Sequence, residues 1–206
     1  MNGQTPRSRH GAGRRSPDDR GGGTQRLFVA VPLPEDLLPL VRDAQAALPA
    51  LPGLRLSRAD QLHVTLAFIG QVDETKAQAA RAVVTGLSQS LVAGAGMITG
   101  FLFLPSATKA RVVTLAVRDD EGAFATLFES VMNGLEGAGV MKREKRPFRP
   151  HLTIARLRIP GPVRPKLDCD EAPFSIESVC LYKSELKRDG AIYSVLAGKN
   201  RRGTDE

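Results

Sequence analysis

Two of the three histidines in the chain each stand two residues before a threonine, within a short apolar segment. One segment reads HVTLA from His63 to Ala67, and the other reads HLTIA from His151 to Ala155. On a β-strand, residues i and i+2 project from the same face. Each segment therefore presents an imidazole beside a hydroxyl, while its apolar residues face the opposite way. The repeat indicates two equivalent lobes that bring both polar pairs to one cleft.

Two imidazoles and two hydroxyls suit an in-line displacement at phosphorus. One base takes a proton from the attacking oxygen, and one acid protonates the departing oxygen on the opposite side. Histidine, whose ordinary pKa is about 6.5, can do either near neutral pH. We therefore predict that His63 and His151 form the catalytic pair. Thr65 and Thr153 are predicted to donate hydrogen bonds to the phosphoryl oxygens.

The segments around these pairs predict an α+β fold with mainly antiparallel sheets. Apolar residues form an unbroken run in the expected strand 27–31 and alternate in 62–69 and 151–158. They recur at helical spacing in the expected helices, with Asp73 as the N-cap of the second. The expected strands are 27–31, 62–69, 96–104, 110–117, 151–158, 174–182 and 191–196, and the expected helices are 35–48, 74–91 and 121–136. Strands outnumber helices and several are joined by short turns, which favours antiparallel sheets over a doubly wound parallel sheet.

Composition excludes several classes of protein. The chain has 206 residues, of which 42% are hydrophobic, and this suits a globular domain rather than a wholly disordered chain. No apolar run is long enough to span a bilayer, and no secretory signal is recognisable, so we expect a soluble cytoplasmic protein. Cys169 and Cys180 form no metal-ligand cluster, and the standard glycine-rich nucleotide motifs are absent. We expect no metal and no cofactor.

The formal net charge of +7 is unevenly distributed. Residues 1–25 carry +3 with six glycines and few large apolar side chains, and residues 199–206 carry +1. We predict that both are flexible tails flanking a single bilobal domain over 26–198. Within that domain, residues 142–149 alone carry +4, so the remainder sums to −1.

The basic segment just before His151 is a candidate RNA-binding element. Its cations Lys142, Arg143, Lys145, Arg146 and Arg149 can contact a phosphate backbone, and Phe148 can stack on a base. A solvated loop with a packed phenylalanine explains the same residues.

Three further residues have competing interpretations. Arg156 follows Thr153 by three positions, so a regular strand would turn it away from the histidine face, which favours burial with a partner over phosphate contact. Ser184 and Tyr193 belong to the closing strands, where either a structural or a substrate-binding role is compatible with the pattern.

Four segments together resemble a known family. HVTLAFIG, PHLTIARLR, the opening RLFVAVPLP and the late VCLYKSEL are similar to the 2H phosphoesterase superfamily, specifically its RNA 2′,3′-cyclic phosphodiesterase branch, also called LigT or 2′-5′ RNA ligase-like proteins. The resemblance covers residues 26 to about 197. It implies a bilobal, pseudo-twofold fold in which two mainly antiparallel sheets flanked by helices surround a central cleft.

The resemblance also implies an activity. It is the metal-independent hydrolysis of an RNA-terminal 2′,3′-cyclic phosphate to a 2′-phosphate, with reversible 2′-5′ ligation as a related reaction. Because the 3′ oxygen then departs, our hypothesis is that His151 activates water and His63 protonates the leaving oxygen. The sequence leaves this order open. A monomer is the expected state.

Two other functions remain open on the sequence alone. The same cleft can act on small cyclic nucleotides or 2′-5′ oligonucleotides, as other branches of the superfamily do. A non-catalytic RNA-binding protein is the alternative from a different class, although it has no need of two titratable His-x-Thr pairs.

Overall fold

The structure, a computed structural model, describes residues 23–187 and 190–199. Its elements follow in this order: β1 (Gln25–Pro32), η1 (Glu35–Leu37), α1 (Leu38–Ala46), β2 (Leu54–Leu56), η2 (Ala59–Gln61), β3 (His63–Val72), α2 (Glu74–Gln89), β4 (Gly94–Leu104), β5 (Ala110–Arg118), α3 (Ala123–Gly137), β6 (His151–Gly161), β7 (Ala172–Ile176), β8 (Cys180–Lys187) and β9 (Gly190–Ala197). The predicted tails, 1–25 and 199–206, lie for the most part outside the described residues. No helix in the described part of the chain is long and apolar enough to cross a membrane.

The three predicted helices are present, and their ends have local causes. Asp73 caps α2 as predicted, because its side chain accepts a hydrogen bond from the backbone N–H of Lys76 at 2.9 Å. The first predicted helix opens with the 3₁₀ turn η1 before α1 begins at Leu38. The short strand β2, which the apolar pattern did not predict, pairs with β6.

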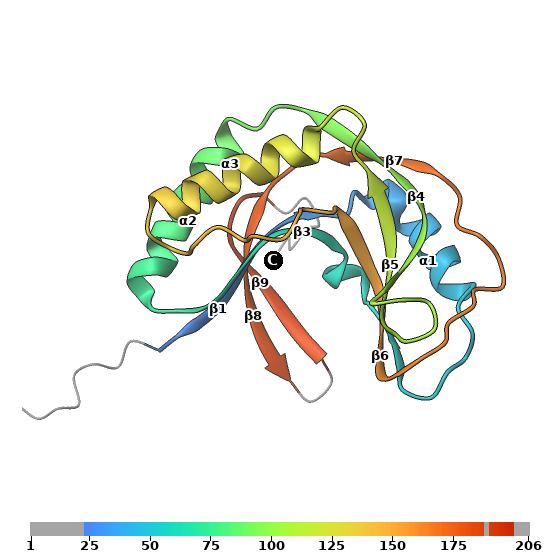
Figure 1. The fold of residues 1–206 in the computed structure, drawn as a ribbon. Helices are drawn as coiled ribbons and strands as arrows, with labels where there is room; N and C mark the ends of the chain where they lie inside the picture. The colour runs from blue at the N-terminus through green and yellow to red at the C-terminus, as the bar shows by residue number, and fades with distance from the viewer. Residues whose placement is uncertain (1–22, 188–189, 200–206) are drawn as a thin grey trace, which may run out of the picture.

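In the described chain, the nine strands form one sheet in the order β7-β4-β5-β6-β3-β1-β8-β9, with β2 beside β6. All of its pairings are antiparallel, as predicted. Its two halves meet between β3 and β6 through a single register pair, Val64 opposite Leu152. Figure 1 shows α2 and α3 packed together on one side of the strongly curved sheet, with α1 beside the other half. The bilobal α+β architecture is thus confirmed, with the two predicted sheets continuous at this pair.

The prediction of a single strand over 174–182 is wrong. β7 pairs with β4 at one edge of the sheet, whereas β8 pairs with β1 in the other half. Phe174 and Ile176 face the main core before the break, and Val179 and Leu181 face it afterwards, so the alternation shifts by one residue. Cys180 is also buried, in the smaller cluster on the other face, and the resulting run of buried residues conceals the break in the sequence. Three linking residues reach little more than about 10–15 Å, so the curvature of the sheet must bring these two regions close together.

β3 and β6 contain matching irregularities just after their His-x-Thr segments. The register shifts past Leu66 in β3 and past Ile154 in β6, so two consecutive residues face the core in each strand. Such a bulge reverses which face the following residues occupy. Phe68 and Arg156 therefore share the face of the histidines and threonines.

β1 is buried on both faces, which explains its unbroken apolar run. Leu27, Val29 and Val31 belong to the main core beneath the helices. Phe28 and Ala30 point to the opposite face and pack in a smaller cluster with Cys180 and Tyr182. This smaller cluster supports the face on which His63 lies.

Leu152 is predicted to be essential to the junction between the two halves. It is fully buried, so Leu152→Ala should lower the free energy of unfolding by about 2–5 kcal/mol, through lost burial and a residual cavity. Urea unfolding followed by circular dichroism measures this effect. The matched control Leu167→Ala removes a side chain that is 72% exposed and should cost less than about 0.5 kcal/mol. Equal effects of the two variants would contradict the assigned role of Leu152.

Candidate active site

The junction of the two halves arranges the four predicted site residues. The single register pair between β3 and β6 joins the apolar residues that separate histidine from threonine in each segment. Because the strands are antiparallel, His63 lies on the side of Thr153, and Thr65 lies on the side of His151. The imidazoles thus occupy one diagonal of a four-cornered arrangement and the hydroxyls occupy the other. Diagonal neighbours in such pairs are about 7–8 Å apart, which leaves room between the imidazoles for a phosphoryl group.

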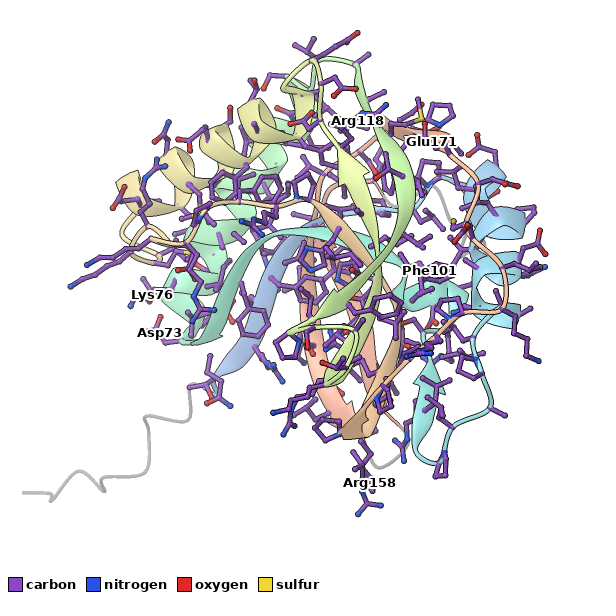
Figure 2. All side chains as sticks on the ribbon, turned by 45° about the vertical axis from the view of Figure 1, so that its right-hand side comes forward. Asp73, Lys76, Phe101, Arg118, Arg158 and Glu171 are labelled. Carbon is purple, nitrogen blue, oxygen red and sulfur yellow. The ribbon has the colours of Figure 1, made fainter. Side chains whose placement is uncertain are left out.

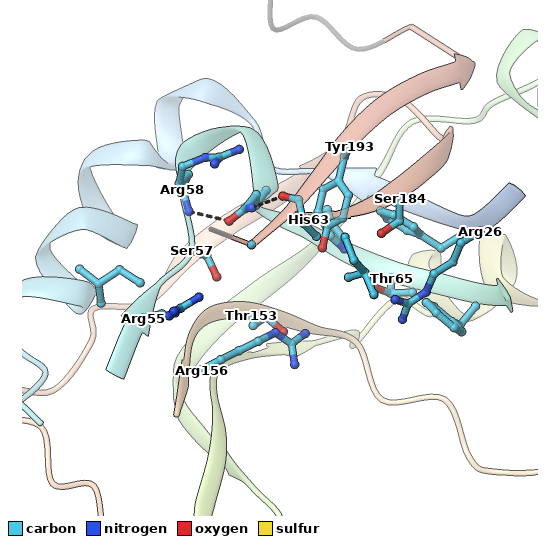
Figure 3. Close-up of a pocket in the computed structure, with 17 residues that line it drawn as sticks. Arg26, Arg55, Ser57, Arg58, His63, Thr65, Thr153, Arg156, Ser184 and Tyr193 are labelled. Atoms are coloured by element: carbon cyan, nitrogen blue, oxygen red, sulfur yellow. Dashed lines mark hydrogen bonds between the residues drawn. The ribbon is translucent and has the colours of Figure 1, made fainter. Parts of the chain in front are cut away.

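A cavity of about 460 Å³ lies over three of these corners, His63, Thr65 and Thr153. Figure 3 shows that its wall also includes Ser184 and Tyr193, which come from the hairpin of β8 and β9. Residues of β2, of the turn η2 and of the link between them complete the wall. None of the described residues that line this cavity is acidic.

A second cavity of about 450 Å³ adjoins the first, and His151 lines it. Thr65 and Phe68 contribute to the walls of both cavities. Much of the second wall is apolar and comes from β4 and α3, including Phe128 and Met132. The structure therefore places the two histidines in adjacent cavities that share Thr65, rather than in one pocket.

His63 lies against an aromatic cluster. Its ring centroid is 4.9 Å from that of Phe28, 6.1 Å from Tyr182 and 5.5 Å from Tyr193, which meets it edge-on. These contacts limit rotation of the imidazole and hold it toward the cavity. Tyr193 thus has a packing role at His63 as well as a place in the cavity wall.

His151 is oriented by the backbone instead. Its Nδ1 lies 2.7 Å from the carbonyl oxygen of Arg149. A carbonyl oxygen can only accept, so Nδ1 carries the proton and donates it. In the neutral imidazole this leaves Nε2 as the acceptor nitrogen, and it is the nitrogen suited to take a proton from an attacking group.

The prediction that Arg156 points away from the histidine face is wrong. The bulge after Thr153 turns Arg156 to the same side, where its exposed side chain lines the first cavity. Arg26 and Arg55 line it as well, and no ion pair of these three arginines is found among the described residues. The guanidinium of Arg26 also lies 4.9 Å from the ring centroid of Phe68. The cavity wall therefore carries several arginines and, among its described residues, no carboxylate.

The structure separates the members of the predicted basic segment. Arg143 is turned back onto α3, where it forms ion pairs with Glu129 at 2.7 Å and Glu136 at 3.6 Å and a hydrogen bond with Asn133. These contacts favour a structural role for Arg143 over the predicted contact with RNA. Lys142 and Lys145 are exposed, and their predicted contact with RNA stays a prediction.

Figure 2 shows how densely charged side chains cover the outer surface of the fold, including Lys76, Arg118 and Arg158.

The end of the basic segment forms part of the second cavity. Arg146, Phe148 and Arg149 all line it beside His151. One face of the Phe148 ring is occupied, because it stacks on Phe128 with 4.4 Å between centroids and 4° between planes. Of the two roles that the sequence left open for Phe148, the structure shows the packed one. Stacking of Phe148 on a base stays a prediction.

Sequence reasoning missed the residues that β2 and η2 bring to the cavity, namely Arg55, Ser57, Arg58 and Gln61. Gln61 donates a hydrogen bond of 2.6 Å to the carbonyl oxygen of Ala191, which joins η2 to β9 in the cavity wall. The sequence does contain a signal for these residues, because two arginines, Arg55 and Arg58, stand shortly before the first His-x-Thr segment. No three potential metal ligands lie together within the described residues.

Comparisons with known proteins show what this chain resembles. The family model described as the 2′-5′ RNA ligase superfamily matches residues 28–188. A protein of Thermus thermophilus named RNA 2′,3′-cyclic phosphodiesterase is 33% identical over 86% of this chain and 91% of its own length. A protein of Methanocaldococcus jannaschii with the same name is 26% identical over 83% of this chain and 98% of its own. The crystal structure of TT0787 of Thermus thermophilus superposes with a TM-score of 0.72 and 31% identity, over 87% of this chain and 99% of that one.

The cationic wall predicts that the first cavity binds inorganic phosphate through Arg156. Arg156→Gln should weaken phosphate binding about tenfold, because charge-assisted hydrogen bonds to an anion are lost. Calorimetric titration with phosphate measures this change. Arg158→Gln is the matched control, since Arg158 is an exposed arginine of the same strand outside the cavity wall. Phosphate binding by Arg156→Gln with the wild-type affinity would contradict the assignment.

Proposed function

The chain belongs to the 2′-5′ RNA ligase superfamily, and from this membership we propose that it is an RNA 2′,3′-cyclic phosphodiesterase. Its reaction opens the cyclic phosphate at the end of an RNA and leaves a 2′-phosphate. The observation that carries this function is the four-cornered arrangement, in which imidazoles and hydroxyls alternate around one position. A phosphoryl group at that position has a histidine on either side, as an in-line displacement requires.

The reaction balances with the groups that the chain supplies. A water oxygen attacks phosphorus while one histidine takes its proton, and the bond from phosphorus to the 3′ oxygen breaks. The other histidine gives its proton to that 3′ oxygen, which becomes a hydroxyl. Both proton transfers are therefore provided by side chains, and we propose that the reaction needs no metal.

We assign the base to His151 and the acid to His63. The hydrogen bond from Nδ1 of His151 to the carbonyl of Arg149 supports the first assignment, because it leaves Nε2 as the acceptor. His63 then begins the cycle protonated and is restored by the proton that His151 has taken up. In ligation a 5′-hydroxyl replaces water as the nucleophile and the 3′ oxygen again departs, so His151 and His63 keep these roles. The roles exchange when the 2′-5′ linkage is cleaved back to the cyclic phosphate.

Thr65 and Thr153 occupy the other diagonal and donate hydrogen bonds to the non-bridging oxygens. These oxygens gain negative charge in the transition state, so donors placed beforehand stabilise it. Arg156 adds a positive charge on the same face. We further propose that the enzyme acts in the cytoplasm as a monomer.

Replacement of either histidine should nearly abolish the reaction. His63→Ala and His151→Ala are each expected to lower kcat by about 10²- to 10⁴-fold on an RNA that ends in a 2′,3′-cyclic phosphate, because each removes one proton transfer. The assay is run with EDTA and identifies the product as a 2′- or a 3′-phosphate. More than about a tenth of wild-type activity in either variant, or a 3′-phosphate product, would refute the mechanism. Binding without turnover by the wild-type protein would favour a non-catalytic RNA-binding protein.

The exposed cations before β6 are proposed to contact the RNA backbone. Lys142→Gln combined with Lys145→Gln should flatten the dependence of log kcat/KM on log salt by about 0.7 for each phosphate that is no longer neutralised, as counterion release on single strands predicts. Arg143 is left unchanged because its ion pairs hold the segment on α3. Assays at several salt concentrations provide the slope, and an unchanged slope would exclude these lysines from the binding surface.

A further inference from the structure

The first cavity extends beyond His63, Thr65 and Thr153 to a pair of arginines. Arg55 in β2 and Arg156 in β6 are direct cross-strand partners, so their side chains project from the same face. Along β6, the pair of Thr65 and His151 comes first and the pair of His63 and Thr153 second. The arginine pair comes third.

Like charges directly opposite one another destabilise a sheet unless an anion lies between or above them. Arg58, which lines the same cavity, forms an ion pair with Asp60. Its Nε and Nη2 atoms donate hydrogen bonds of 3.0 and 2.7 Å to the Asp60 carboxylate. No carboxylate contact of this kind is found for Arg55 or Arg156 among the described residues. This difference between Arg58 and the other two arginines of the cavity wall indicates that Arg55 and Arg156 are available to bind a negative group from outside the chain.

The position of Arg55 separates it from the phosphoryl group that reacts. Figure 3 shows Arg55 and Ser57 on the opposite side of Thr153 from Arg26, all facing the same cavity. The register places Arg55 about three residues along β6 from Thr153, which is roughly 7–10 Å at the rise of a strand. A single phosphoryl group held by the two threonines does not fill this part of the cavity.

We propose that Arg55, assisted by Ser57, forms a second phosphate subsite that binds the phosphodiester immediately 5′ of the terminal nucleotide. Arg156 lies between this subsite and the reacting phosphate. The proposal rests on the proposed phosphodiesterase function and specifies its substrate class. The enzyme is selective for oligoribonucleotides, and small cyclic nucleotides are poorer substrates because they leave the subsite empty.

Three substrates with the same terminal nucleoside 2′,3′-cyclic phosphate test the subsite. They are the mononucleotide, the dinucleotide with a natural internal linkage, and the dinucleotide with an uncharged methylphosphonate linkage. The wild-type enzyme should favour the natural dinucleotide over each of the other two by about tenfold in kcat/KM, at the low end of what a hydrogen bond to a charged group contributes. Arg55→Gln should remove most of the preference over the methylphosphonate.

Arg158→Gln serves as the matched control and should retain the preference, because Arg158 lies on β6 outside the cavity wall. Arg55→Lys keeps the charge but loses the planar fork, so its preference should be intermediate. Equal turnover of both dinucleotides by the wild-type enzyme, or an unchanged preference in Arg55→Gln, would overturn the subsite while leaving the phosphodiesterase intact.

Binding tests the same subsite without turnover. The natural and methylphosphonate dinucleotides, each ending in a 2′-phosphate, are titrated against wild-type protein and Arg55→Gln in a calorimeter. A preference of about tenfold for the natural linkage that disappears in Arg55→Gln supports the subsite, and its absence in the wild type overturns it. If this preference is present but none of the cyclic substrates is turned over, the proposed function fails and the subsite stands.

Discussion

The fold and the candidate site both depend on one contact, the pairing of Val64 with Leu152 where β3 meets β6. Both side chains are fully buried, so their packing holds the two halves of the sheet together. The histidines and threonines on either side of this pair must then project from the opposite face. A shift of one residue in either strand would bury its imidazole and hydroxyl and expose its apolar residues. Hydrophobic burial therefore fixes the spacing of the polar groups.

The matching bulges give the two halves the same backbone and different chemistry. After each His-x-Thr segment two consecutive residues face the core, and the next residue returns to the cavity side. That residue is Phe68 in one half and Arg156 in the other. The half that contains Phe68 also has a positive charge at this position, because the guanidinium of Arg26 lies over the Phe68 ring. An asymmetric substrate can thus be bound in one orientation by a pseudo-symmetric frame.

Positive charge at the site comes from elements that are distant in sequence. Arg26, Arg55 and Arg156 belong to three different strands and line one cavity without an acidic residue among its described lining. By contrast, the densest basic run in the sequence is partly neutralised, since Arg143 is paired with two glutamates of α3. Local charge density along the chain therefore indicated the basic segment before β6, but it did not indicate the arginines that three strands bring to the wall of the first cavity.

The sequence alone determined most of the elements, the sheet type, the core faces of the strands and the identity of the His-x-Thr pairs. These follow from local patterns, namely alternation in strands, helical spacing and the cap at Asp73, which depend on neighbours along the chain. Only the tertiary structure decided the face on which Arg156 lies, the break between β7 and β8, and the cross-strand pairing of Arg55 with Arg156. A bulge reverses the face of the residues that follow it without changing the apolar pattern. The strand break is concealed because Cys180 and Leu181 are buried on opposite faces at the start of β8. Arg55 and Arg156 are distant in the sequence, so no local spacing predicts their pairing. Such features depend on which strands become neighbours, and packing of the whole chain settles that.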